Sequence, residues 1–161
     1  MLPKLSIELV PSTQWGSNLR SALRVSKWDK LRRDCYEKAG HICEICGGSG
    51  LEQRRRHAVE CHERWEYDDE TNTQRLIGVI ALCPFCHQVK HIGRALRVGA
   101  GRQALQWLAN INEWTQQEVE AYIAFAFAIQ QVRSVASWTL DLSWLFSKES
   151  PFDADEEIFR A

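Results

Sequence analysis

The chain has 161 residues, of which 45% are hydrophobic and 25% are charged, and its formal net charge at pH 7 is −1. These ordinary values predict a single globular domain over residues 1–161. No apolar run reaches the roughly 20 residues of a membrane span, so we expect no membrane association. The first residues lack the apolar stretch of a signal peptide, which predicts a cytoplasmic location with reduced thiols.

The N-terminal residues 1–39 are predicted to form a strand and helices. Leu5–Leu9 alternates apolar and polar residues, which is the period of a half-buried strand. A short helix is expected over Ser17–Val25. A longer helix is expected over Lys27–Ala39, with Ser26 as its N-cap and a glycine just past its end.

The core is predicted to lie within residues 40–98 and to be stabilised by metal. Two C-x-x-C pairs that are well separated in the chain can place four thiolates around one tetrahedral Zn²⁺. Because four sulfurs leave no coordination position open, we expect this zinc to be structural. The four cysteines are Cys43, Cys46, Cys83 and Cys86.

Between and after these pairs, the sequence predicts two strands and a helix. His57–Glu63 favours a short strand whose successive side chains face opposite sides. The polar stretch Tyr67–Thr73 predicts a connection, and the β-branched, apolar Leu76–Leu82 predicts a buried strand. Pro84 suits the first turn of a helix that should continue to about Val98.

Further helices and a strand are predicted in residues 99–147. A short helix is expected over Arg102–Ala109, and a buried helix should follow the capping-box residue Thr115 and end near Ser134. The alternation in Trp138–Trp144 predicts a strand that could pair with Leu5–Leu9. The acidic tail, residues 148–161, is expected to be loose.

Three histidines are placed where they could share a second metal ion. His87 and His91 are four residues apart, so a helix would bring their Cβ atoms to about 5–6 Å on one face. His62, in the first core strand, offers a third imidazole. A single histidine in a strand is more often a surface or core residue. Their combination beside a four-cysteine site favours metal binding, whereas His41 and His57 are expected to be structural or solvent-facing.

Positive charge is clustered around the predicted core. Clustered cations suit the phosphates of nucleic acid, although any one cluster could also be a solvated helix face. The candidate nucleic-acid contacts are Arg54, Arg55, Arg56, Lys90, Arg94 and Arg97.

The motif residues resemble those of a known family. Val59-Glu60-Cys61-His62-Glu63, followed by Ala81-Leu82-Cys83-Pro84-Phe85-Cys86-His87 and then His91, resembles the His-Asn-His (HNH) endonucleases, especially their small zinc-containing bacterial members. The resemblance covers Gly40 to about Val98. It implies an α+β fold with a zinc-bound ββα-metal (His-Me finger) core, flanking helices and short terminal strands.

The same resemblance implies a metal-dependent endonuclease that hydrolyses phosphodiester bonds, in duplex DNA rather than RNA. His62, His87 and His91 would hold one divalent ion (Mg²⁺, Mn²⁺, Ni²⁺ or Zn²⁺), and imidazole-rich sites suit transition ions better than Mg²⁺. Glu63 occupies the position of the family's general-base histidine. Glu63 could therefore be the catalytic base. In the alternative register His62 is the base, and Glu60 or Glu63 supplies an oxygen ligand.

The chain departs from the family at the middle asparagine, which orients the base. Gly78 occupies this position and has no side chain, although Gln74 or Asn72 could substitute. This departure favours an alternative function, a catalytically weak or inactive zinc-stabilised module that binds nucleic acid or a protein partner. The Trp-rich terminal segments also leave a homodimer open.

Overall fold

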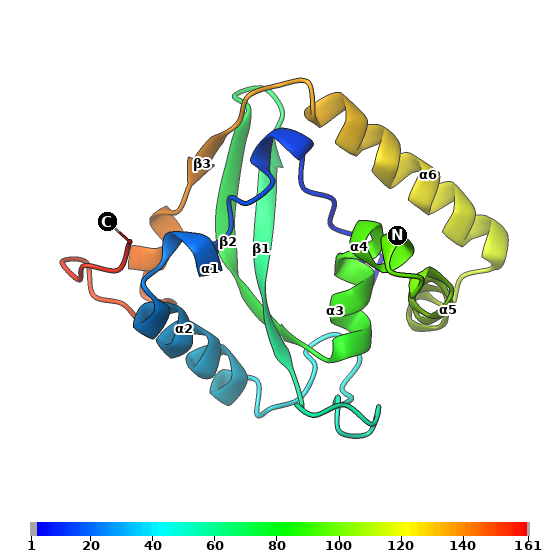
Figure 1. Cartoon of the computed structure of the whole chain (residues 1–161), viewed down its shortest axis with the longest axis horizontal. Coiled ribbons are helices and arrows are strands. Elements are labelled where there is room, and N and C mark those ends of the chain that lie inside the picture. The colour runs from blue at the N-terminus through cyan, green and yellow to red at the C-terminus, as the bar shows by residue number, and fades with distance from the viewer. Residues whose placement is uncertain (1–2, 161) are drawn as a thin grey trace.

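A three-stranded sheet runs through the centre of the computed structural model, which describes residues 3–160 (Figure 1). β1 (Glu60–Asp68) and β2 (Thr73–Leu82) form an antiparallel hairpin. β3 (Thr139–Asp141) pairs parallel with the start of β2. The expected α+β class is therefore confirmed. The expected pairing of the last strand is wrong, because β3 joins β2 and Leu5–Leu9 forms no strand.

The two faces of the hairpin are covered by different helices. Because side chains alternate along β1, Cys61 packs with Cys35 of α2 (Val25–Lys38), whereas His62 faces α3 (Pro84–Lys90). Figure 1 shows α2 on one side of the hairpin and α3 on the other. The alternation predicted for the first core strand is confirmed, and it separates a packing face from a histidine-bearing face.

The helices that precede the hairpin form with shifted bounds. α1 (Leu19–Ala22) is shorter than predicted, and Asn18 caps it by accepting from the Ser21 N–H at 2.9 Å. α2 begins earlier than predicted, with Arg24 rather than Ser26 at its N-cap. Gly40, with φ of +60°, follows the end of α2 as expected.

The helix predicted over residues 84–98 is divided at His91 into α3 and α4 (Ile92–Arg97). Its buried residues recur every third position, a spacing that a helix of 3.6 residues per turn cannot keep on one face. The break at His91, with φ of −97° and ψ of 43°, lets both halves bury their apolar side chains. These buried residues are Cys86, Val89, Ile92 and Ala95.

The N-terminal segment, residues 5–10, crosses between the hairpin and the later helices, α5 (Gly101–Asn112) and α6 (Gln116–Arg133). Its apolar residues face the core, as the alternation predicted. Its backbone groups bond to helices rather than to a strand. The Leu5 N–H donates to Asn112 Oδ1 (3.0 Å), the Ile7 N–H donates to Tyr122 Oη (3.1 Å), and the Glu8 N–H donates to the Lys90 carbonyl (3.2 Å).

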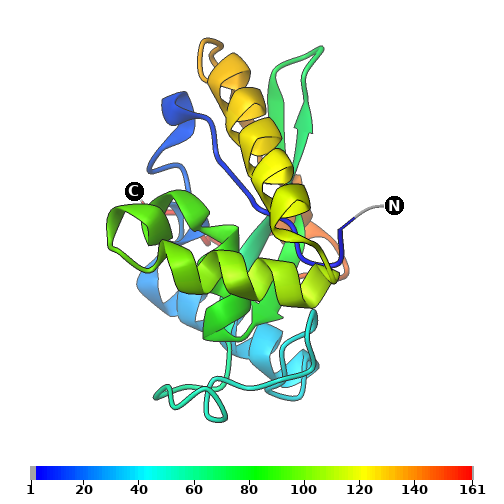
Figure 2. The same cartoon turned by 90° about the vertical axis from the view of Figure 1, so that its right-hand side faces the viewer.

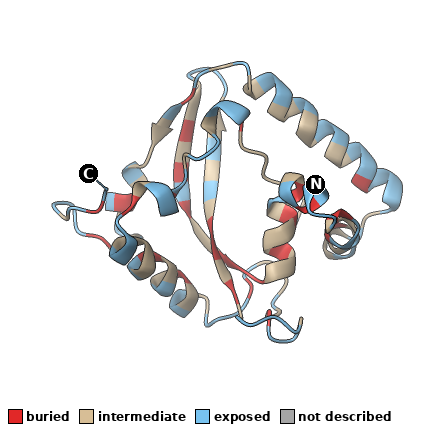
Figure 3. Ribbon diagram, in the orientation of Figure 1, coloured by how far each residue is buried: buried red, intermediate tan, exposed pale blue. Residues whose placement is uncertain are grey.

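Helix α6 forms as predicted, but it is not the buried helix that its composition suggested. The capping box between Thr115 and Glu118 is present. Val119 is the one residue of α6 that is buried, whereas Phe125 is 63% exposed. Figures 2 and 3 show α6 along the outside of the molecule, with only one side against the remainder.

The tail after residue 147 packs against the α1–α2 side of the sheet, so the prediction that it is loose is wrong. Phe152 and Ile158 are 5% and 1% exposed, in the cluster that contains Leu19, Leu23 and Leu31. Glu156 forms ion pairs with Lys27 and Lys30. Backbone hydrogen bonds from Arg24 N–H to the Ile158 carbonyl and from Arg160 N–H to the Ala22 carbonyl, both 2.9 Å, add to these contacts.

The core of the described residues surrounds the hairpin in three apolar clusters. No helix within residues 3–160 combines the length and apolarity needed to cross a bilayer. The divisions into residues 1–39, 40–98, 99–147 and 148–161 remain predictions. Residues 1, 2 and 161, at their ends, lie outside the described part of the chain.

Candidate metal centres

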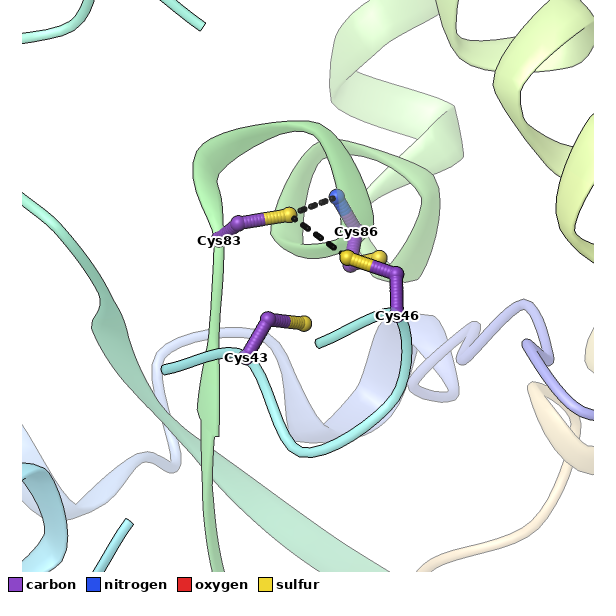
Figure 4. A group of neighbouring side chains, drawn as sticks. All are labelled: Cys43, Cys46, Cys83 and Cys86. Atoms are coloured by element: carbon purple, nitrogen blue, oxygen red, sulfur yellow. Dashed lines mark hydrogen bonds between the residues drawn. The ribbon is translucent and has the colours of Figure 1, made fainter. Parts of the chain in front are cut away.

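The four predicted zinc ligands converge on one point, where the loop before the hairpin meets the start of α3 (Figure 4). Their sulfur atoms lie within 4.8 Å of one another, and the Cys46 and Cys83 sulfurs are 3.6 Å apart. Two sulfurs bound at about 2.3 Å to one tetrahedral ion would be separated by about 3.8 Å. This donor set could hold a structural metal ion such as zinc.

Hydrogen bonds to the sulfurs fit a site that carries negative charge. Gln53 Nε2 donates to Cys83 Sγ at 3.1 Å, and Trp107 Nε1 donates to Cys86 Sγ at 3.2 Å. Hydrogen bonds from the Cys83 and Cys86 side chains lower the pKa of the Cys43 thiol. The surroundings therefore favour thiolate at Cys43, whereas burial raises the pKa of Cys46 to about 11 and the neighbouring Cys43 and Cys83 raise the pKa of Cys86. Four thiolates packed this closely would need a cation among them, and thiolate is the form that binds metal.

The three predicted histidines converge on a second point, between β1 and α3. One nitrogen of each of His62, His87 and His91 lies within 4.8 Å of the others. The Nε2 atoms of His87 and His91 are 3.2 Å apart, close to the roughly 3.4 Å expected for two nitrogens on one tetrahedral ion. His62 is buried, His87 is half-buried and His91 is exposed, so the cluster is open on one side.

Each of two histidines in this cluster is held by a carboxylate. Glu60 contacts His87 Nδ1 with one oxygen, and its other oxygen accepts from His57 Nε2 at 2.6 Å. Burial opposes ionisation of Glu60, but the hydrogen bonds and charges of His87 and His57 outweigh it and lower its pKa to about 2. Glu60 is therefore ionised at neutral pH and can fix the orientation of the His87 ring.

Glu8 plays the corresponding part for His62. Its carboxylate contacts His62 Nε2 and accepts from the Trp65 N–H at 3.2 Å on the outer edge of β1. Burial opposes its ionisation, but His62 and Lys90 together lower the pKa of Glu8. With Nε2 engaged, the buried Nδ1 of His62 has no hydrogen-bond partner within residues 3–160.

The pKa of His91 is lowered to about 4, because desolvation and the neighbouring His87 and His62 rings disfavour its charged form. A neutral imidazole is the form that can donate a lone pair to a metal ion. Carboxylate–imidazole pairs that leave one ring nitrogen free are the usual outer support of metal-binding histidines. The donor set thus fits a divalent ion.

Glu63 lies on the opposite side of β1 from the histidine cluster and is not one of its converging side chains. Its Oε1 accepts from the Leu19 N–H at 3.0 Å, which ties β1 to the start of α1. It nevertheless lines the same cavity as His62 and His91. Glu63 therefore shares a cavity wall with His62 and His91, but it is not placed to join the three imidazoles.

Gly78 adopts a backbone conformation that disfavours other residues, with φ of +148°. It lies beside an irregularity in the hairpin, where the register shifts between Arg64 and Trp65. A Cβ at this position would lie 3.9 Å from the Trp144 ring, which packs with the α1–α2 cluster. The glycine thus has a backbone role, and a side chain here would start away from the histidines.

Neither substitute considered for the missing asparagine is near the histidines. Gln74 pairs with Tyr67 at the far end of the hairpin, whereas Ile80 pairs with His62. At about 3.3 Å per residue, Gln74 is about 20 Å along β2 from the histidine site. Asn72 lies in the turn beyond it, with φ of +50°. The expectation that either could substitute is wrong.

The predicted basic contacts divide into three groups. Arg55 and Arg94 line a cavity of about 300 Å³ beside His87 and His91, and Arg97 lines a larger cavity beside His62. Arg54 and Arg56 are exposed but line neither cavity. Lys90 is turned inward and donates to Ser6 Oγ at 2.8 Å, so its prediction as a surface contact is wrong.

Comparison with known proteins identifies no relative of this chain. No protein-family model matches it, no curated protein matches its sequence, and no solved structure matches its fold.

Sequence reasoning missed Glu8 and the role of His57. The alternation of residues 5–9 predicts only that Glu8 lies on the polar face of a strand, and nothing in this local pattern indicates a contact with His62. The expectation that His57 is structural or solvent-facing leaves out its pairing with Glu60, which the spacing of three residues would allow. The sequence suggests Glu60 only as an alternative oxygen ligand, whereas in the structure it contacts His87 and His57.

Proposed function

We propose that this chain is a metal-dependent endonuclease that hydrolyses DNA phosphodiester bonds on a ββα-metal scaffold of the HNH kind. The observation that supports it most directly is the convergence of His62 from β1 with His87 and His91 at α3. The hairpin that leads directly into α3, beside a four-cysteine cluster, agrees with the arrangement that the family resemblance implies.

In this proposal His62 Nδ1 and the Nε2 atoms of His87 and His91 hold one divalent ion. Their partners Glu8 and Glu60 keep the opposite ring nitrogens engaged and so fix which nitrogen faces the ion. When bound, the ion would neutralise charge on the phosphate and its leaving oxygen. An open side at His91 leaves room for a phosphate to approach.

Glu63 is the proposed general base. His62 is poorly suited to this role because it is buried, its Nε2 is engaged by Glu8, and its Nδ1 is assigned to the metal ion. Glu63 is half-buried at the wall of the cavity, and the Leu19 N–H fixes one of its oxygens. Its second oxygen could accept a proton from a water molecule as that water attacks the phosphate.

Arg55 and Arg94 are the proposed contacts for the DNA backbone. Both line the smaller cavity beside His87 and His91, and their charges lie where a bound phosphate chain would pass. Neither forms a salt bridge within residues 3–160. Arginine can bind phosphate with two parallel hydrogen bonds, so it suits this position.

A plasmid-nicking assay tests the proposed function. Purified protein is incubated with supercoiled plasmid and Mg²⁺, Mn²⁺, Ni²⁺ or Zn²⁺, beside His87→Ala, Glu63→Gln and the control His41→Asn. We expect nicking by the wild type and by the control, and losses of about 100-fold or more in the other two variants. The proposal fails if wild type and His87→Ala leave the plasmid equally intact with every metal.

A second candidate function is a zinc-stabilised DNA-binding module without efficient cleavage. Gly78 supports it, because the family's orienting asparagine is absent and neither Gln74 nor Asn72 lies near the histidines to replace it. This candidate predicts that the wild type shifts DNA in a gel without nicking it. In that case Arg55→Gln and Arg94→Gln would still weaken binding, whereas His87→Ala would not.

A further inference from the structure

The larger cavity extends well beyond the histidine site and is not needed to hold a metal ion. Its volume is about 770 Å³, and it lies between β1, α4, α6 and the loop before α1. His62 and His91 form one part of its wall. The loop that carries Trp15 forms another part of the wall. The cavity therefore connects the histidine site to an exposed indole ring.

The walls of this cavity are mainly apolar. Trp15 is 67% exposed, although a large indole ring would normally be expected to find cover in a protein of this size. Apolar walls with an aromatic ring suit a flat, weakly polar group rather than a bare phosphate. The apolar side chains that line the cavity are Leu9, Val10, Trp15, Trp65, Leu96 and Phe127.

The exposed Trp15 ring is mounted on a fixed loop. The backbone and side chains of this loop bond to the segment that follows α6, and Ser21 Oγ donates to the Gly16 carbonyl at 2.7 Å. These bonds hold the backbone that carries Trp15, so the indole ring is presented from a fixed point at the cavity wall. The bonds to the later segment are Ser12 N–H to Ser134 Oγ (2.9 Å), Thr13 Oγ1 to the Ala136 carbonyl (2.9 Å) and Gln14 Nε2 to the Trp138 carbonyl (3.0 Å).

Two arginines in the cavity wall suit an anionic ligand. The wall also contains two carboxylates, but Glu8 is paired with His62 and one oxygen of Glu63 accepts from the Leu19 N–H. Arg94 and Arg97 of α4 line the same cavity as the Trp15 loop, and neither forms a salt bridge in the described part of the chain. A ligand that satisfies both features has an anionic backbone and a flat, apolar face. A nucleotide has both, and bases stack on aromatic side chains with little regard to sequence.

We infer that this cavity receives one unpaired nucleobase of the DNA substrate, stacked on Trp15 and adjacent to the phosphate at the histidine site. The inference rests on the proposed function, because it places that phosphate at His62 and His91. A base inside a duplex is covered on both faces and cannot enter the cavity. The preferred substrate is therefore DNA with a base outside the stack, such as a single strand, a bulge or a flipped nucleotide.

Binding of matched duplexes tests the inference without relying on cleavage. Three labelled duplexes are used: one fully paired, one with a single-nucleotide bulge, and one whose bulged nucleotide lacks its base. Binding is measured by fluorescence anisotropy at fixed salt with no added divalent metal. We expect the wild type to bind the bulged duplex about tenfold more tightly than the other two, the effect of one base–aromatic stack.

Trp15→Ala should lose this preference and keep its affinity for the paired duplex. Phe125→Ala is the matched control, since Phe125 is equally exposed on α6 but does not line the cavity, and it should behave as the wild type. The inference is overturned if the wild type binds the bulged and baseless duplexes equally, or if Trp15→Ala keeps the preference. Plasmid nicking in that case would leave the proposed function intact, whereas absence of both binding and nicking would overturn both.

Discussion

The cysteine cluster and the histidine cluster use the same helix for opposite purposes. Cys83 and Cys86 belong to the start of α3, and His87 and His91 follow on its next turn. Three of the four cysteines are at most 2% exposed, whereas the histidine cluster opens through His91 onto two cavities. A closed set of four sulfurs can only stabilise a fold, but an open set of three imidazoles can also receive a ligand.

This difference implies a one-way dependence between the two sites. The sulfur cluster fixes the first turn of α3 to the loop before the hairpin, and that turn sets where His87 and His91 lie. Loss of the sulfur cluster should therefore destroy the histidine site. Loss of a histidine should leave the sulfur cluster intact. Substitutions in the closed cysteine cluster should therefore affect folding and metal binding most, and substitutions in the open histidine cluster should have smaller effects.

Replacing one sulfur ligand should have the largest effect. We expect Cys86→Ser to lose bound zinc and cooperative folding, because a structural zinc can contribute about 10–16 kcal/mol of apparent folding free energy, more than many domains possess. Metal content by mass spectrometry and near-ultraviolet circular dichroism would report both losses. The control is Cys35→Ala, a buried cysteine outside the cluster. A folded, metal-free Cys86→Ser variant would contradict a stabilising zinc.

Removing one histidine of the open cluster should lower the affinity of the proposed second metal site without affecting the cysteine cluster. We expect His91→Ala to keep its zinc and its thermal transition, since His91 is exposed. Its affinity for Mn²⁺ or Ni²⁺, measured by titration calorimetry, should fall by more than about 100-fold. Loss of a residue that only hydrogen-bonds to a metal ligand typically lowers metal affinity by about 10–100-fold, and loss of the ligand itself should cost more. His41→Asn is the control, because asparagine tolerates the positive φ of 59° at that position. Unchanged affinity in His91→Ala would exclude it as a ligand.

Removing the carboxylate behind a ligand should have a smaller effect on the same site. We expect Glu60→Gln to lower the affinity for the second metal by about 10–100-fold, because the amide lacks the charge that orients His87. The same calorimetric titration measures it. Glu66→Gln is the matched control on β1, since Glu66 pairs with Arg75 at the surface. Equal affinities in the two variants would show that Glu60 does not support the site.

The sequence predicted the members of both clusters because the spacing within each pair of ligands is local, and the hairpin brings the distant ligands to them. Two C-x-x-C pairs and a pair of histidines one turn apart define their own geometry once the hairpin and helix form. Alternation along the first strand likewise predicted that His62 and Glu63 would separate. These are short-range relations, and they hold even where helix bounds shift by a few residues.

The supporting contacts could not be predicted because they join distant segments. Glu8 meets His62 only because the N-terminal segment is held by Asn112 and Tyr122, and these contacts leave no local pattern in the sequence. The same reasoning applies to the tail, where Ile158 docks against the first helices. Local periodicity predicts which residues are apolar, but not which of two distant surfaces they cover.

Substitution of Gly78 should affect the stability of the hairpin rather than either metal site, and it tests the family comparison directly. We expect Gly78→Ala and Gly78→Asn each to lower the free energy of unfolding by about 1–3 kcal/mol, because φ of +148° strains any residue with a Cβ. Urea denaturation measures the loss. Neither variant should nick plasmid faster than the wild type, since a side chain at this position starts beside Trp144 rather than the histidines. Faster nicking by Gly78→Asn alone would show that the missing asparagine limits catalysis.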